Sequence, residues 1–199
     1  MNEDDGDELA RAHLAGDPAA FGALVDRFQE RFYRVAYRVT GDPDEALDVV
    51  QDAFVKIHDR LPSWDGSARF SSWAFRLVTN QAIDGLRRKG RERRAWEGRA
   101  LEDAGETHDD ADAGLVAEEQ AGVVGQVKAA IAALPPGQRA IVALRHYEGF
   151  SLKEIAEARG CALGTVKSTL HQAFRSLRRS LGEETLAAVG RGREDEHGP

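Results

Sequence analysis

Apolar residues recur every three or four positions through the first half of the chain, which is the spacing of one face of an α-helix. The pattern predicts three helices, at about 18–40, 43–61 and 71–89. Asp17-Pro18 and Asp42-Pro43 each place an N-capping aspartate before a proline at the first helical position. These two dipeptides therefore mark where the first two helices are expected to begin.

Helical spacing returns between Leu115 and Gly182. A first helix stops at Pro135-Pro136, and a second follows it. A helix from Ser151 to Arg159, a turn at Gly160-Cys161 and a helix through Leu177 then predict a helix–turn–helix.

The helix–turn–helix has a well-marked start and a second helix with two distinct faces. Ser151 followed by Glu154 is a capping box. Val166, Leu170 and Phe174 are predicted to pack inward. The opposite face would present the polar residues Thr165, Lys167, Ser168, His171 and Gln172.

The segment from Trp96 to Gly114 is acidic and lacks apolar periodicity, which is typical of a flexible linker. No stretch shows the alternation of a strand, so the predicted fold class is all-α. We expect a three- to four-helix bundle and a second small domain with the helix–turn–helix. The predicted boundaries are an acidic N-terminal extension at 1–17, a first domain at 18–95, a linker at 96–117, a second domain at 118–184 and a tail at 185–199.

Charge is strongly segregated along the chain, although the overall net charge is only −7. Residues 87–94 and 139–179 each carry a net charge of +5. Residues 97–119 carry −8, and residues 1–20 carry −5. Basic patches are the usual footprint of phosphate binding, although a single basic run is equally well explained as a solvated face.

Several classes of protein are excluded. We expect no enzyme, because the sequence holds no Walker loop, dinucleotide glycine motif or serine elbow. The six histidines are scattered, so no metal site and no cofactor are expected. Cys161 is the only cysteine, and residues 1–8 lack an apolar stretch, which together favour a reducing cytoplasm. No apolar run is long enough for membrane insertion.

The segment from Trp64 to Trp73 interleaves aromatic and cationic residues, and Asn80 and the basic cluster follow it. Aromatic rings stack on unpaired bases, and arginine or lysine holds phosphates, so this composition suits single-stranded nucleic acid. Tryptophans beside a loop more often belong to a core. The helix–turn–helix suits the major groove of duplex DNA, and its plain alternative is a helical hairpin.

Four motifs in order resemble the extracytoplasmic-function (ECF) family of RNA polymerase sigma factors, of the sigma-70 type, group IV. The motifs are DVVQDAF at 48–54, FSSWAFRLVTN at 70–80, ALPPGQR at 133–139 and GTVKS at 164–168. The resemblance covers about 20–94 and 134–179. It implies a sigma factor that binds core RNA polymerase, directs promoter-specific initiation at −35 and −10 elements and helps melt DNA.

The resemblance also implies roles for particular residues and partners. The polymerase β′ clamp coiled coil would be held by Asp48, Gln51, Asp52 and Phe54. The −10 element would be contacted by Asp65, Gly66, Ser67, Ala68, Arg69, Phe70, Trp73, Asn80, Arg87, Arg88, Lys89 and Arg91. The −35 element would be contacted by Thr165, Lys167, Ser168, His171, Gln172 and Arg175. Further partners would be the polymerase β flap and an anti-sigma factor.

The recognition helix departs from the family pattern. Where members commonly carry arginines, this chain has Thr169, Gln172 and Phe174. Fewer phosphate contacts should weaken −35 binding and flatten its salt dependence. Gln172 is a candidate to pair with an adenine, a standard bidentate partner of glutamine.

Alternative interpretations remain at this stage. A stand-alone helix–turn–helix regulator would explain the second domain without polymerase, and a protein-binding adaptor would leave both basic patches unexplained. The acidic linker is either a mimic of RNA in the polymerase channel or a plain spacer. The acidic N-terminus either keeps the free protein off DNA or is silent. Cys161 is expected to be a small buried residue rather than a redox centre.

Overall fold

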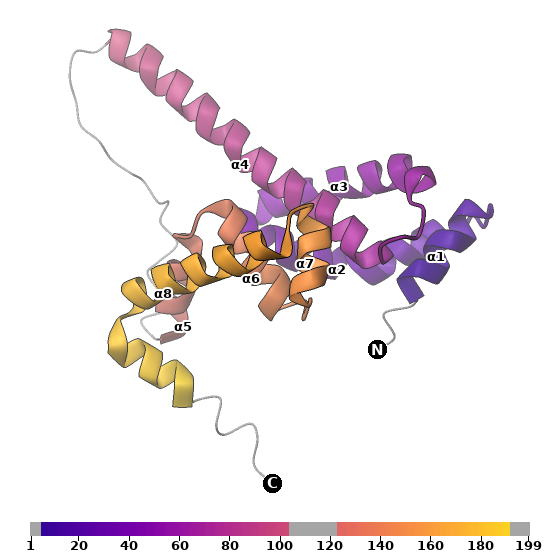
Figure 1. Ribbon diagram of the computed structural model, residues 1–199. Helices are drawn as coiled ribbons and strands as arrows, with labels where there is room; N and C mark the ends of the chain where they lie inside the picture. The colour runs from indigo at the N-terminus through magenta and orange to yellow at the C-terminus, as the bar shows by residue number, and fades with distance from the viewer. Residues whose placement is uncertain (1–4, 104–122, 192–199) are drawn as a thin grey trace.

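The computed structural model describes residues 5–103 and 123–191, and all regular structure in these ranges is helical (Figure 1). This agrees with the predicted all-α class. The predicted linker beyond residue 103 lies outside the described residues. The helices are α1 (Asp5–Leu14), α2 (Ala20–Thr40), α3 (Pro43–Arg60), the short 3-10 helix η1 (Leu61–Ser63), α4 (Phe70–Asp103), α5 (Val123–Ala132), α6 (Pro136–His146), α7 (Leu152–Arg159) and α8 (Leu163–Arg191).

Helices α2, α3 and α4 form the bundle of the first domain around a cluster of aromatic rings. The centre of the Phe32 ring lies 5.0 Å from that of Phe75 on α4 and 5.2 Å from that of Phe54 on α3. Phe32 and Phe75 are fully buried, whereas Phe54 is half-buried. Edge-to-face and tilted packing of this kind joins three helices through one buried contact.

One of the two expected helix caps is present, and the other is displaced. Asp42 caps α3 through hydrogen bonds from the backbone N–H groups of Asp44 and Glu45, as predicted. The predicted cap at Asp17 is wrong, because α2 begins only at Ala20. Asp17 Oδ1 instead accepts a hydrogen bond from Ala19 N at 2.9 Å, which stabilises the turn before the helix.

The acidic N-terminal extension contains a helix that the hydrophobic pattern did not indicate. Helix α1 packs against α2, α4 and η1, and its Ala10 is fully buried. It is missed because only Leu9, Ala10 and Leu14 supply an apolar face, among acidic and small residues. The described part of residues 1–17 therefore belongs to the first domain.

Helix α4 is longer than the predicted 71–89 and continues to Asp103, into the expected linker. Its C-terminal half projects away from the other helices (Figure 1). Residues 96–103 are thus helical rather than linker-like, a correction to the predicted boundary. The cause is that arginine, glutamate, alanine and leucine, which make up most of this segment, are good helix formers even without an apolar stripe.

Helices α5 to α8 form the second domain, with α7 and α8 as the predicted helix–turn–helix. Ser151 and Glu154 form the expected capping box at the start of α7. Gly160 ends α7 in the left-handed region, with φ +60°, which favours glycine. Helix α8 runs to Arg191, past the expected domain end at residue 184.

The two domains lie against each other in the structure. Helix α7 packs on α4, and α6 packs on α2 (Figure 1). Between them, the Phe150 ring of the second domain lies 5.2 Å from the Phe75 ring of the first, edge to face. The chain is therefore closed, with the helix–turn–helix seated on the first domain.

Candidate functional site

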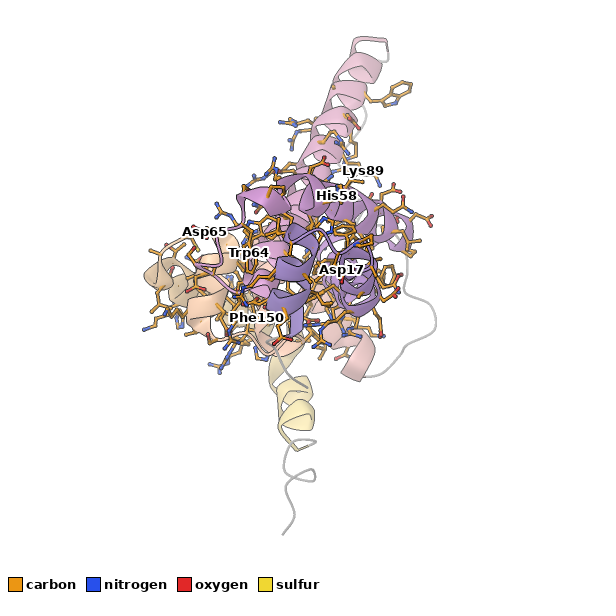
Figure 2. The ribbon with its side chains drawn as sticks, turned by 90° about the vertical axis from the view of Figure 1, so that its right-hand side faces the viewer. Asp17, His58, Trp64, Asp65, Lys89 and Phe150 are labelled. Carbon is orange, nitrogen blue, oxygen red and sulfur yellow. The ribbon has the colours of Figure 1, made fainter. Side chains whose placement is uncertain are left out.

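The first candidate surface is the loop between η1 and α4, residues 64–69, which is folded on itself. Trp64 Nε1 donates a hydrogen bond to Ala68 O at 3.0 Å, so the two ends of the loop are joined. Asp65 Oδ1 accepts from Ser67 N at 2.9 Å, and Gly66 takes a positive φ of 74°. Hydrogen bonds from Ser67 lower the pKa of the Asp65 carboxyl. The loop tip is thus a preformed turn (Figure 2).

The predicted members of this surface divide into exposed and buried residues. Asp65, Gly66, Ser67 and Arg69 are exposed, and Ala68 is half-exposed. Phe70, also predicted to contact DNA, is 1% exposed in this conformation, so it does not share the exposed surface of the loop tip.

Phe70 belongs to a cluster of packed rings. The Phe28, Trp64 and Trp73 rings surround it, and Trp64 is itself buried. Trp73 is half-buried and packs on the core, which fits the core interpretation of the aromatic residues in this segment.

Asn80 lies on the exposed side of α4 and is engaged by the other domain. Arg159 Nη1 donates to Asn80 Oδ1 at 3.0 Å and to Thr79 Oγ1 at 3.2 Å. Burial lowers the pKa of the Arg159 guanidinium. The side chain of Arg76 lies directly against Gly160, where a Cβ atom would come within 2.9 Å of it. The helix–turn–helix therefore covers the side of α4 that carries Asn80.

The basic segment 87–94 lies on a helix rather than in a loop. Arg87, Arg88 and Arg91 are exposed. Lys89, also predicted to contact DNA, forms a hydrogen-bonded ion pair with Glu45 of α3, and this hydrogen bond raises the pKa of its ammonium group (Figure 2). The cations of this segment are thus not equivalent.

The second candidate surface is the outer face of α3. Asp48, Gln51 and Asp52 are exposed as predicted, whereas Phe54 is half-buried against Phe32. Asp52 Oδ2 accepts a hydrogen bond from Gln81 Nε2 of α4 at 2.6 Å.

The same face carries apolar residues that the sequence interpretation missed. Leu47 is 50% exposed and Val55 is 62% exposed. The sequence does contain a sign of these two residues, because both are apolar and lie outside the stripe of α3 that is buried. Exposed apolar and acidic residues on one helix suit a protein partner.

The third candidate surface is the first half of α8. All six residues predicted to contact DNA are exposed, namely Thr165, Lys167, Ser168, His171, Gln172 and Arg175. Arg175 Nη2 lies 3.2 Å from His171 Nε2. Val166 and Leu170 are buried beneath them, as predicted.

The predicted inward position of Phe174 is wrong. Phe174 is 47% exposed, and its ring meets His146 of α6 edge to face at 5.6 Å. The fully buried residue at this level is Ala173. Cys161, expected to be buried, is half-buried in the turn.

Charged pairs hold the two domains together. Arg31 Nε donates to Glu148 Oε2 at 2.7 Å, and the Glu148 side chain is only 2% exposed. Arg34 Nη2 lies 4.0 Å from the other oxygen of the same carboxylate. The guanidinium carbon of Arg38 lies 3.6 Å from the centre of the Tyr147 ring. A buried carboxylate held in this way is costly to leave without its partner.

Glu154 links the capping box to the first domain. Its Oε1 pairs with Arg69 of the loop at 3.2 Å, while its Oε2 accepts from Ser151 N at 2.8 Å. Burial raises the pKa of the Glu154 carboxyl, but hydrogen bonds from Ser151 and the charge of Arg69 outweigh it, so the pKa is lowered.

The described ranges hold neither a cluster of metal-ligating residues nor a membrane-spanning helix. The His13 and His58 rings lie 5.5 Å apart, yet no group of three histidine, cysteine or acidic residues able to hold a metal occurs in those ranges. None of the helices in the described part of the chain is both long and apolar enough to cross a bilayer.

Fold and surfaces together define a two-domain helical protein with a helix–turn–helix and a basic helix next to a self-organised loop. Comparison with protein families identifies both domains. The family described as Sigma-70 region 2 matches residues 24–92, and Sigma-70, region 4 matches residues 125–177.

Known proteins match most of this chain. The ECF RNA polymerase sigma factor SigW of Bacillus subtilis is 31% identical over 177 residues, covering 83% of this chain and 91% of that protein. SigM of Mycobacterium tuberculosis is 34% identical over 175 residues, covering 88% of this chain and 84% of that protein. The chain belongs to the ECF RNA polymerase sigma factors.

Two solved structures share the fold. One, described as CnrH in complex with the cytosolic domain of CnrY, has a TM-score of 0.61 and 24% identity, and the match covers 88% of this chain and 95% of that chain. The sigma factor RpoE in complex with the anti-sigma factor NepR from Bartonella quintana has a TM-score of 0.60 and 24% identity, with 82% and 97% coverage.

Proposed function

We infer that this protein binds core RNA polymerase and directs it to promoters with −35 and −10 elements. The observation that carries the proposal is the match of both sigma regions, 24–92 and 125–177, to separate helical domains with exposed polar surfaces. A stand-alone regulator would leave the first of these regions without a role. We propose that this protein acts by binding rather than by catalysis, and that it works in the cytoplasm, where the polymerase is.

The outer face of α3 is the proposed contact with the polymerase clamp. Asp48, Gln51 and Asp52 offer exposed polar groups there. Leu47 and Val55 add exposed apolar area on the same helix, which a protein partner would bury. Phe54 contributes by holding α3 on Phe32.

The loop 64–69 and the exposed side of α4 are the proposed −10 surface. A base leaving the non-template strand would meet the turn at Asp65, Gly66 and Ser67, which is already formed before DNA arrives. Unstacking a base costs a few kcal/mol, and a preformed turn reduces the ordering cost that binding must offset. Arg87, Arg88 and Arg91 would hold the adjacent backbone.

The exposed face of α8 is the proposed −35 surface, lying in the major groove. Lys167 and Arg175 would contact phosphates, and Gln172 would read an adenine edge. The further proposed partners are the polymerase β flap, for the second domain, and an anti-sigma factor. The matched RpoE structure is described in complex with the anti-sigma factor NepR, which supports the latter.

A core-binding assay tests the proposal. The wild-type protein should co-elute with purified bacterial core polymerase, and Asp48→Arg should weaken that binding about tenfold, since a reversed charge at a rim costs roughly 1.4 kcal/mol or more. Asp26→Arg is the matched control, because Asp26 is an exposed acid on α2, away from the α3 face. Failure of the wild-type protein to bind core polymerase contradicts the proposal.

A further inference from the structure

Helix α4 begins without a capping residue of its own. The residues directly before it, Ala68 and Arg69, have side chains that cannot accept a hydrogen bond from a backbone N–H. The acceptor comes instead from the N-terminal helix, where Asp7 Oδ1 accepts from Phe70 N at 2.7 Å. A carboxylate at this place satisfies an orphan donor and suits the positive end of the helix dipole.

The same helix also contacts the other end of the loop. The guanidinium carbon of Arg11 lies 5.7 Å from the centre of the Trp64 ring, and Asp7 Oδ2 lies 3.8 Å from Arg11 Nη2. Trp64 in turn bonds to Ala68 O. Asp7 therefore contacts Phe70, directly after the loop, and Arg11 contacts Trp64, the first residue of the loop.

Close approach of α1 depends on a glycine. A Cβ atom at Gly6 would lie 3.0 Å from the Phe28 ring and 3.4 Å from the Phe70 ring. The first turn of α1 thus rests directly on the aromatic cluster beneath the loop. Together with the buried Ala10, this contact holds Asp7 at a fixed height above the start of α4.

We propose that Asp7 is a positioning residue for −10 strand binding, setting the register of α4 and the shape of the 64–69 loop through the Phe70 N–H. The inference rests on the proposed function of that loop. It gives the acidic N-terminal segment a role in DNA recognition that does not require it to touch DNA. The side chains at the loop tip then meet the unpaired strand in one conformation, which lowers the entropy cost of binding.

The test uses holoenzyme, made from core polymerase and the full chain, and a fluorescent single-stranded oligonucleotide. The oligonucleotide is the non-template strand across the −10 element of a promoter mapped by transcription. Asp7→Ala should weaken strand binding about fivefold, the scale of losing one helix cap. Asp7→Asn should restore it, because asparagine is an equally good capping acceptor. Glu8→Ala is the matched control, removing an exposed carboxylate from the same helix.

Core-polymerase affinity, measured in parallel, separates positioning from simple destabilisation. Asp7→Ala should leave core binding within about twofold, since the α3 face is untouched; a parallel loss of core binding overturns the positioning role. Equal strand binding by wild type and Asp7→Ala overturns this inference alone, as does failure of Asp7→Asn to restore it. If wild-type holoenzyme does not bind the strand, the proposed function of the loop fails first.

Discussion

Phe174 stands exposed on the recognition helix at a position where the family pattern has arginine. The residue is 47% exposed. Among the aromatic rings of the described residues, its ring contacts that of His146 alone, in an edge-to-face arrangement. Nothing in the packing requires an aromatic residue here, because Ala173 fills the buried position. The position is therefore open to a substitution that adds a phosphate contact.

We expect Phe174→Arg to strengthen holoenzyme binding to a −35 duplex. One added phosphate contact should steepen the slope of log K against log salt by about one. Titration at several salt concentrations measures this directly. Phe174→Leu, which adds no charge, should leave the slope unchanged, and an unchanged slope with arginine would show that the position does not face DNA.

At this scale, sequence patterning predicted buried residues well where only one stripe was possible. Val166 and Leu170 are buried as expected. It failed at Phe174, because Ala173 and Phe174 both continue the stripe at allowed spacing and only packing against α6 chooses between them. The same limit applies to Phe70, whose burial depends on rings from α2 and the loop as well as from its own helix.

Helix α4 combines a core segment, part of the proposed −10 surface and a projecting basic segment in one element. Its cations differ because α3 is close to only some of them. Lys89 is paired with Glu45, whereas Arg91 is exposed and forms no ion pair with another described residue. A helical rod places each cation on a defined face, which a flexible linker would not do.

This difference leads to a paired prediction. Arg91→Ala should reduce the salt slope of promoter binding by about one, as expected for one lost phosphate contact. Lys89→Ala should change the slope much less, because the Lys89 ammonium is already paired with the Glu45 carboxylate. Filter binding of holoenzyme to promoter DNA across a salt series measures both variants. Equal slopes for the two would contradict the distinction.

At the scale of elements, sequence alone predicted most helices but not their lengths. The caps at Asp42 and Ser151 are strong local signals, and both hold. Helix α1 and the end of α4 were missed because charged residues hide their periodicity. The cap of α4 was not predictable locally, since its acceptor, Asp7, is 63 residues away.

As a whole molecule, the chain is closed on the surface that the proposed function needs. Arg159 donates a hydrogen bond to Asn80, and Glu154 forms an ion pair with Arg69. Both residues are proposed to contact the −10 element, so the second domain must move before they can. Of the ion pairs between the described parts of the two domains, that of Glu148 with Arg31 has the more deeply buried carboxylate and the shorter distance. Breaking it by removing one partner is costly. Such pairings between residues 117 positions apart are not readable from sequence periodicity.

Glu148→Ala is therefore expected to open the free protein. The substitution leaves the partly exposed Arg31 without its buried carboxylate partner. We expect this to shift the equilibrium between the closed and open arrangements of the two domains by about 2 kcal/mol, a value between those of exposed and buried ion pairs. Small-angle scattering should then report a larger radius of gyration. Asp26→Ala is the control, because it removes an exposed carboxylate from α2, the helix that carries Arg31. An unchanged radius for Glu148→Ala would contradict this account of closure.

Transcription in vitro tests whether this chain selects promoters for RNA polymerase. Purified bacterial core polymerase would be given a pool of genomic promoter fragments, with and without the protein, and the transcript starts would be mapped. We expect discrete new starts only when the protein is added, preceded by shared −10 and −35 elements. The same starts with and without the protein, in a reaction where it co-elutes with core polymerase, would contradict it.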